Sequence, residues 1–401
     1  VSHWVRTVTD APSLASDAAD AVAAARQFPG QIATLILPAN TAWDAATNTN
    51  SHLGTEKSSL QAAETAMPVP KSKVRDAAAL LQNDSRAVLI LGGNCVHSTA
   101  LEFASRIAQK TGCDLLAETS NARFERGVGR VSVPSIPYPV DKALETLAPY
   151  TTLITVNAKA PVAFFAYPDK PSCLYRDDAE VFTLAGIQDD GEAALKELAA
   201  ELGASDLLPD LQTLALPSMP DDGPLNPVSI ADVIANLIPD NAIIVDEAIT
   251  TGRNFQAATA GALRHDWLQI CGGSIGDGFP LATGAAVACP DRKVIGLQAD
   301  GSGMYTLQAL WTQARENLDI TTIVFANHTY EILKHELKNV NAKSGKIAQD
   351  MMELDRPHLD WVALATGMGV DAVKVETVGE LIAAIETGLA SRSPYLIEAL
   401  L

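Results

Sequence analysis

A chain of 401 residues is long enough for two to three domains, and 47% hydrophobic with 5% aromatic residues is typical of α/β domains rich in small aliphatic side chains. The formal net charge of −19 argues against nucleic acid and anionic membrane surfaces as partners. No uninterrupted apolar run reaches the roughly 18 residues of a membrane-spanning helix, so we expect no membrane span.

The cysteines indicate a reducing compartment. They are scattered along the chain, and their odd number and lack of Cys-x-x-Cys spacing predict free thiols rather than disulfides. We therefore expect a cytoplasmic protein. The five residues are Cys95, Cys113, Cys173, Cys271 and Cys289.

The first 70 residues predict a helix, a strand and a linker. Segment 14–26 is rich in alanine and predicts a helix, which Pro29 and Gly30 end. Segment 32–37 is apolar and predicts a strand. Residues 41–70 are polar and rich in alanine, threonine and asparagine, so they predict a linker.

Residues 71–206 predict a second α/β unit. Its first strand is followed by Gly92-Gly93-Asn94 and a helix, which suggests dinucleotide binding, but the full Gly-x-Gly-x-x-Gly motif and its downstream acidic residue are missing. We therefore favour a structural Rossmann-like domain. Loop 121–130 carries three arginines; it could contact an anion or an adenine nucleotide, but a solvated loop is favoured. The expected strands are 87–91, 115–116, 152–156 and 181–184, and the expected helix is 98–110.

Residues 207–227 are rich in proline and aspartate and predict a second linker, after which strands and helices alternate to Leu401. This alternation predicts a parallel, doubly wound sheet. Leu307, Leu310, Trp311 and Ala314 have helical spacing and predict the buried face of one helix. The expected strands are 242–245, 267–270, 294–297, 320–326, 370–375 and 395–401; further helices are expected through 288, near 360–366 and from 378 to 389.

Polar residues follow two of these strands at their carboxyl ends. Asp300 follows strand 294–297 in a small-residue turn, and Asn327 follows strand 320–326. Open parallel sheets bind ligands at this edge. A carboxylate and an amide oxygen suit Mg²⁺, and the turn glycines let backbone approach a diphosphate. Either residue alone is more often an ordinary turn or strand-end residue.

Taken together, this stretch resembles the thiamine-diphosphate signature Gly-Asp-Gly followed by Asn, with Asp300 and Asn327 separated by 27 positions. The chain is similar to the benzoylformate decarboxylase and acetolactate synthase superfamily. One departure is Ala299 in place of the first glycine. The resemblance implies that Asp300, the Asn327 side chain and the Thr329 carbonyl hold Mg²⁺.

Two further turns resemble cofactor loops of that family. Segment 246–251 resembles the loop that binds the terminal phosphate, which makes Thr250 a candidate donor, although Ile249 replaces the usual hydroxyl neighbour. Segment 272–280 resembles the glycine loop in which a large apolar residue, here Ile275, holds the cofactor bent. The resemblance assigns cofactor contacts to Thr250, Gly273, Ser274, Ile275, Gly301, Ser302 and Tyr330.

The resemblance also implies a division of the chain into three domains. Residues 1–45 resemble the tail of a pyrimidine-binding domain whose bulk does not precede Val1. Residues 46–70 are then a linker, 71–206 the central Rossmann-like domain, 207–227 a linker and 228–401 the diphosphate-binding domain. Some relatives hold FAD in the central domain and many hold nothing, so FAD is the less favoured reading here.

The implied activity is a thiamine-diphosphate- and Mg²⁺-dependent reaction of a 2-oxo acid, with acetolactate-synthase-like carboligation. A benzoylformate-type decarboxylase and a non-catalytic cofactor-binding fragment are the alternatives. In the family the activating glutamate lies in the pyrimidine-binding domain, so no catalytic residue is assigned and the chain as given is expected to be inactive. His328 and His335 are weak candidates near the substrate. A homodimer or homotetramer is expected.

Overall fold

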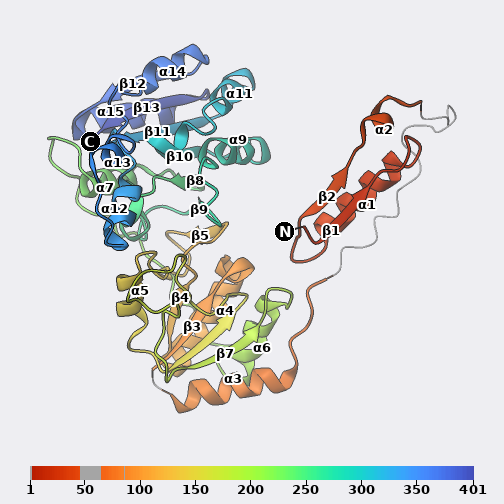
Figure 1. Cartoon of the computed structure of the whole chain (residues 1–401). Coiled ribbons are helices and arrows are strands. Elements are labelled where there is room, and N and C mark those ends of the chain that lie inside the picture. Colours follow the sequence, from red (N-terminus) through yellow and green to blue (C-terminus); the bar gives the residue numbers. More distant parts are fainter. Residues whose placement is uncertain (1, 46–64, 85) are drawn as a thin grey trace.

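A computed structural model describes residues 2–45, 65–84 and 86–401, and the strands of this part of the chain form three sheets (Figure 1). They have two, four and seven strands. All strand pairs within them are parallel except one. The predicted fold class, α/β with parallel sheets, is therefore confirmed.

The first sheet is a small β–α–β unit. Strands β1 (Trp4–Thr7) and β2 (Ala33–Ile36) pair in parallel, and helix α1 (Leu14–Arg26) connects them. Helix α1 has the predicted bounds, and a short helix α2 (Ala39–Trp43) follows. Most of the predicted linker 46–70 lies outside the described residues; its end, at Met67, bridges to Asp189 of the central segment.

The second sheet is formed by the central segment in the order β4-β3-β6-β7. Strand β3 (Ala87–Leu91) is buried along its whole length, as its uninterrupted apolar sequence requires when helices cover both faces. The other strands are β4 (Asp114–Ala117), β6 (Thr152–Val156) and β7 (Glu180–Ala185). The helices are α3 (Lys71–Asn83), η1 (Gly93–Val96), α4 (Ser98–Thr111), α5 (Val140–Leu147) and α6 (Gly191–Glu201).

The third sheet contains the strands of residues 242–400 in the order β12-β13-β11-β10-β8-β9, with β5 (Phe124–Arg126) at its outer edge. Strands β10 and β11 lie side by side near its centre. The strands are β8 (Ala242–Glu247), β9 (His265–Gln269), β10 (Val294–Ala299), β11 (Ile320–Ala326), β12 (Asp371–Val375) and β13 (Tyr395–Leu400). The helices are α7 (Pro227–Leu237), η2 (Thr251–Asn254), α8 (Phe255–Ala258), α9 (Gly278–Ala288), α10 (Asp300–Gly303), α11 (Ala309–Arg315), α12 (Glu331–Asn339), α13 (Lys346–Asp350), α14 (Trp361–Gly367) and α15 (Val378–Ala390).

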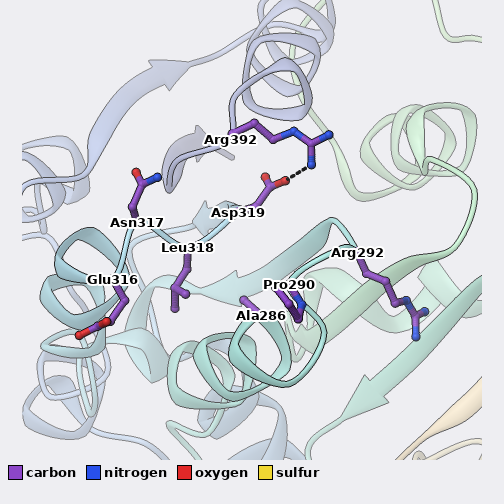
Figure 2. A pocket seen from close by; sticks show the side chains of 8 residues that line it. All are labelled: Ala286, Pro290, Arg292, Glu316, Asn317, Leu318, Asp319 and Arg392. Carbon is purple, nitrogen blue, oxygen red and sulfur yellow. Dashed lines mark hydrogen bonds and ion pairs between the residues drawn. The ribbon is translucent and has the colours of Figure 1, made fainter.

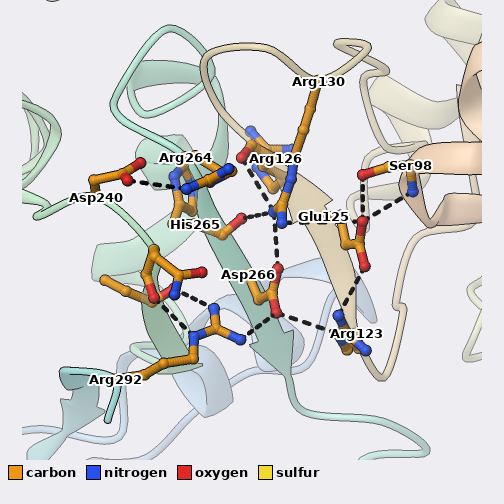
Figure 3. Close-up of polar contacts among 12 residues, drawn as sticks. Ser98, Arg123, Glu125, Arg126, Arg130, Asp240, Arg264, His265, Asp266 and Arg292 are labelled. Atoms are coloured by element: carbon orange, nitrogen blue, oxygen red, sulfur yellow. Dashed lines mark hydrogen bonds and ion pairs between the residues drawn. The ribbon is translucent and has the colours of Figure 1, made fainter.

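The arginine-rich segment 121–130 is not the solvated loop that we favoured. Part of it forms β5, which pairs antiparallel with β9 and so joins the third sheet. The Arg126 side chain is buried between the rings of Phe124 and Trp267, and only 7% of the residue is exposed. Arg123 and Arg130 both bind Asp266 of β9 (Figure 3). The arginines therefore make contacts within the protein, although the Arg123 side chain is 49% exposed.

Two other expectations need correction or comment. Helix α11 begins at Ala309, and Trp311 is 53% exposed beneath the Arg315 guanidinium rather than on the buried face. Segment 207–226 has no helix or strand, as predicted for a linker. Its backbone is nevertheless hydrogen-bonded to other segments: the Gln212 carbonyl accepts from Gly129 N–H, and Gln212 N–H donates to the Arg130 carbonyl. Ala215 N–H donates to the Gly261 carbonyl.

Two sequence-level expectations agree with the structure. All five cysteines are free thiols. No helix within the described ranges combines the length and the apolar character that crossing a membrane would require.

Candidate functional site

Asp300 and Asn327 lie together at the carboxyl edge of the third sheet. They follow the adjacent strands β10 and β11, whose last paired residues are Ala299 and Phe325. Asp300 is only 2% exposed, and its two carboxylate oxygens accept hydrogen bonds from the backbone N–H groups of Gly301 (2.8 Å) and His328 (2.7 Å). The carboxylate thus ties the two strand ends together.

The oxygen atoms at this edge suit a divalent cation. Burial raises the pKa of Asp300 to about 6, although hydrogen bonds from His328 and Gly301 act to lower it. Within the described residues no Lys, Arg or His forms an ion pair with this carboxylate. The Asn327 amide oxygen accepts from Thr329 N–H (3.1 Å) and keeps a second lone pair. A buried carboxylate without a counter-ion is costly, and a Mg²⁺ ion would remove that cost.

Carboxylates, imidazoles and thiols alone do not form a metal site in the described part of the chain. No group of three or more His, Cys, Asp or Glu side chains in the described part of the chain could hold a metal ion. The fit therefore depends on the Asn327 amide and the Thr329 carbonyl beside Asp300. His328 between them has a left-handed backbone (φ 54°), which turns the chain sharply after β11.

Tyr330, which precedes α12, packs against Gly301 in the short helix α10, next to Ser302. A Cβ atom on Gly301 would lie 2.5 Å from the Tyr330 ring, so only glycine lets this ring pack on the turn. The Ser302 hydroxyl is buried and accepts a hydrogen bond from Gln298 (2.8 Å). These three predicted cofactor residues thus adjoin the proposed metal ligands.

The glycine loop, residues 272–278, lies between β9 and α9. Gly272, Gly273 and Gly276 all have left-handed backbones, with φ of 64°, 72° and 95°, which explains why these positions are glycine. Gly273 and Ser274 are exposed, and Ile275 is 44% exposed rather than part of the core.

Glu247 at the end of β8 anchors this loop, a role that sequence reasoning missed. Its buried carboxylate accepts hydrogen bonds from Gly276 N–H, from Gly278 N–H (2.9 Å) and from the Gln298 side chain (2.8 Å). Because both carboxylate oxygens accept hydrogen bonds from the protein, Glu247 is unsuited to activate a cofactor. A glutamate that ends an apolar strand was the signal in the sequence.

Segment 246–251, at the end of β8, carries backbone strain. Ile249 has a left-handed conformation (φ 51°), which is rare for a β-branched residue. Asp246 holds the loop by accepting a hydrogen bond from Ala248 N–H (3.0 Å). Thr250 follows, half-buried, at the start of η2. The strain is consistent with a loop that is shaped for a ligand.

The two histidine candidates have different surroundings. The His328 ring packs against the His358 ring, with a centroid separation of 4.3 Å, and burial lowers its pKa. His335 lies on α12, where its Nε2 is 3.6 Å from a Glu331 carboxylate oxygen one turn earlier. Neither contact identifies a catalytic role.

A cavity of about 320 Å³ lies at the opposite edge of the third sheet (Figure 2). Its residues precede β10, β11 and β13, so it opens at the amino ends of these strands. Asp319 there is neutralised by Lys293 and Arg392. Because parallel α/β sheets bind ligands at the carboxyl edge, we do not assign the site to this cavity. It is lined by Ala286, Pro290, Arg292, Glu316, Asn317, Leu318, Asp319 and Arg392.

Comparison with known proteins places these features in one family. Residues 253–399 match the model "Thiamine pyrophosphate enzyme, C-terminal TPP binding domain". The chain is 41% identical over 401 residues to "Putative acetolactate synthase large subunit IlvX" of Mycobacterium tuberculosis, covering 99% of this chain and 75% of that protein. It is 34% identical over 216 residues to benzoylformate decarboxylase of Pseudomonas aeruginosa, covering 52% of this chain and 40% of that one.

Solved structures agree on the fold. A thiamine diphosphate-dependent 4-hydroxybenzoylformate decarboxylase of Rhodococcus jostii matches with a TM-score of 0.78 and 23% identity, over 99% of this chain and 76% of that chain. The "putative thiamin diphosphate-dependent enzyme isolated from Mycobacterium smegmatis" matches with a TM-score of 0.75 and 21% identity, over 100% of this chain and 76% of that chain. The chain belongs to the thiamine-pyrophosphate-dependent enzyme family that includes acetolactate synthase large subunits and benzoylformate decarboxylases.

Proposed function

We propose that this protein uses thiamine diphosphate and Mg²⁺ to act on a 2-oxo acid and that it joins two substrates, as an acetolactate synthase does. The observation that carries the proposal is the pairing of buried Asp300 with the Asn327–Thr329 turn at one sheet edge. The identity to the M. tuberculosis relative along nearly the whole chain supports the carboligation reading.

In this proposal different residues bind the metal and the cofactor. Asp300, Asn327 and the Thr329 carbonyl hold the metal, which neutralises the diphosphate in a protein whose net charge is −19. Thr250 and the exposed backbone of the glycine loop bind and orient the cofactor. When bound, thiamine diphosphate would accept the electron pair that is released when the bond between the 2-oxo carbon and the carboxylate breaks. The protein contributes position and exclusion of water.

A decarboxylase that releases an aldehyde without ligation is the second candidate. The similarity to benzoylformate decarboxylase of P. aeruginosa supports it, since it covers half of this chain. Both candidates need the same cofactor site and differ only in whether a second substrate is joined.

We also propose that the protein is a homodimer or homotetramer, and that domains divide near residues 46–70 and 207–227.

Ile275 tests the cofactor assignment. We expect Ile275→Ala to leave the affinity for thiamine diphosphate nearly unchanged, because the metal and diphosphate contacts lie elsewhere. In a full-length version of the protein we expect it to lower turnover about 10- to 100-fold, because the apolar side chain that orients the ring is lost. Affinity is measured by cofactor titration and turnover by product formation. Equal losses of affinity and turnover would identify Ile275 as an ordinary packing residue.

Product analysis separates the candidate functions. Pyruvate and benzoylformate are each supplied to the 401-residue chain, and to a chimera that carries the remaining quarter of the M. tuberculosis relative, with cofactor and Mg²⁺. We expect no product from the 401-residue chain, and from the chimera we expect 2-hydroxy-3-oxo acids, which contain a new carbon–carbon bond. Aldehydes alone would favour the decarboxylase. Cofactor binding without any product from either protein would favour a non-catalytic cofactor-binding protein.

A further inference from the structure

Gln298, near the end of β10, lies among the turns of the candidate site and is 2% exposed. Its side-chain nitrogen donates hydrogen bonds to the Glu247 carboxylate (2.8 Å) and to the Ser302 hydroxyl (2.8 Å). Because a carboxylate can only accept, this nitrogen has to face Glu247. Glu247 ends β8, and Ser302 lies in α10, which begins at Asp300. Gln298 thus joins the ends of two neighbouring strands.

The glycine loop is the third turn that Gln298 reaches, and it does so through Glu247. The Glu247 carboxylate accepts hydrogen bonds from the N–H groups of Gly276 and Gly278. A Cβ atom on Gly278 would overlap the Gln298 amide oxygen and lie 2.7 Å from Glu247 Oε2, so the loop lies directly against both side chains. Hydrogen bonds therefore run without a break from Ser302 to the glycine loop.

The segment after β10 contacts the glycine loop at a second place. The Thr306 hydroxyl donates to the Gly276 carbonyl (2.6 Å), and a Cβ atom on Gly276 would lie 2.6 Å from the Tyr305 Cβ atom. Segment 298–306, which contains the proposed metal ligand Asp300, thus holds the loop through Gln298 and through Thr306.

We propose, relying on the function proposed above, that Gln298 is a positioning residue that couples the metal-binding turn to the glycine loop. Metal and diphosphate bind at the turn that contains Asp300 and Ser302. The hydrogen bonds of Gln298 transmit the position of this turn to Glu247, which holds the glycine loop in place. The loop then presents Ile275 to the cofactor. Gln298 is buried and contacts neither the metal nor the cofactor in this proposal.

The physical reason is that this chain of hydrogen bonds is buried. A buried polar group that loses its partner costs more free energy than the bond itself contributes, so Gln298 does not easily release either acceptor. Buried hydrogen bonds that are linked in series also strengthen one another. A ligand that orders the turn at Ser302 therefore restricts the opening of the glycine loop, although the loop follows a different strand.

The test measures hydrogen exchange of the Gly276 and Gly278 amide protons by NMR, in the 401-residue chain with and without saturating thiamine diphosphate and Mg²⁺. Both amides donate to Glu247, so their exchange reports how often the loop opens. We expect the ligands to slow this exchange at least about tenfold in the wild type, the effect of one hydrogen bond to a charged group.

Gln298→Met keeps the length of the side chain and removes both hydrogen bonds, so we expect it to abolish the slowing. Calorimetry should show that the cofactor still binds, at most about tenfold more weakly, because the coupling between ligand and loop is reciprocal. Ser302→Ala breaks the same chain at its other end and is expected to abolish the slowing as well, which keeps the test decisive if Gln298→Met does not fold.

Gln313→Met is the matched control. Gln313 is 1% exposed, and its side-chain amide donates to the Phe279 carbonyl (3.3 Å) and to the Thr283 hydroxyl (3.1 Å), so it joins α11 to α9. The substitution also removes two buried hydrogen bonds and should lower the thermal midpoint, but the ligands are expected to slow the exchange of Gly276 and Gly278 as in the wild type.

The outcomes separate this inference from the proposed function. Slowing that persists in Gln298→Met, or that is lost equally in Gln313→Met, would overturn the coupling and leave Gln298 an ordinary packing residue. If the ligands stabilise the wild type against heat without slowing the two amides, the coupling is wrong and the proposed function stands. If thiamine diphosphate and Mg²⁺ do not stabilise the wild type at all, both are wrong.

Discussion

Asp300→Asn is expected to abolish the stabilisation that thiamine diphosphate and Mg²⁺ together give the folded protein. A ligand that binds only the folded state stabilises it by about 2.7 kcal/mol at a concentration 100 times its dissociation constant. The substitution keeps the size of the side chain and one oxygen, but it removes the negative charge on which the proposed metal site depends. The measurement is the thermal midpoint with cofactor and metal, separately and together.

The same substitution should leave the protein folded in the absence of ligands. The Asp300 carboxylate is buried without a cation, and burial raises its pKa, so its charge is already unfavourable in the folded protein. Glu398→Gln is the matched control, since Glu398 is a buried carboxylate on β13 of the same sheet that belongs to no proposed site. Stabilisation by cofactor and metal that survives in Asp300→Asn, or that is lost equally in Glu398→Gln, would contradict the metal assignment.

The second large effect is expected at Asp266, which is 2% exposed on β9 among three arginines (Figure 3). Its carboxylate binds Arg130 at 2.8 Å, Arg292 at 2.9 Å and Arg123 at 3.2 Å. Asp266→Ala leaves these guanidinium groups without their shared counter-ion, and breaking a buried pair in this way costs about 3–5 kcal/mol. The free energy of unfolding in urea is the measurement.

Asp240→Ala is the matched control because Asp240 also pairs with an arginine, Arg264 at 3.0 Å, but both side chains are exposed. An exposed pair contributes about 1 kcal/mol or less. Burial acts to raise the pKa of Asp266, but its bonds to Arg292 and Arg130 dominate and the pKa is lowered. Its contribution is therefore present above the unfolded pKa of about 3.9 and is lost as the pH falls through the folded value. Similar losses of unfolding free energy in Asp266→Ala and Asp240→Ala would show that the buried ion pairs of Asp266 stabilise the protein no more than an exposed pair does.

Regular elements were predictable where one physical signal dominated. Strand β11 is a run of β-branched and apolar residues buried on both faces, and helix α1 is rich in alanine; both have the predicted bounds. Strands β1 and β5 are four and three residues long, and each contains an arginine, so neither shows a recognisable apolar pattern. Trp311 follows helical spacing, but its ring is covered by Arg315 instead of the core.

The sequence predicts which polar residues lie at the candidate site, but it does not predict the contacts that hold the glycine loop in place. Asp300 and Asn327 stand out because strand ends in a parallel sheet converge, and the sequence shows where the strands end. Glu247 accepts a hydrogen bond from the glycine loop, and the Phe164 ring lies beside Gly273 of this loop. Both residues are far from the loop in the sequence, so only the folded chain reveals these contacts. Long-range contacts between side chains leave no periodic pattern in the sequence.

Strand β5 has a consequence for how the chain can be divided. It comes from the central segment but hydrogen-bonds to β9, so the outermost strand of the third sheet lies about a hundred residues away from the rest of that sheet in the sequence. A gene fragment that starts after the second linker would encode six of the seven strands and leave the backbone of β9 open to pair with other molecules. The central segment and the last segment of the chain are thus unsuited to being exchanged separately during evolution, because the central segment supplies β5 to the sheet of the last segment.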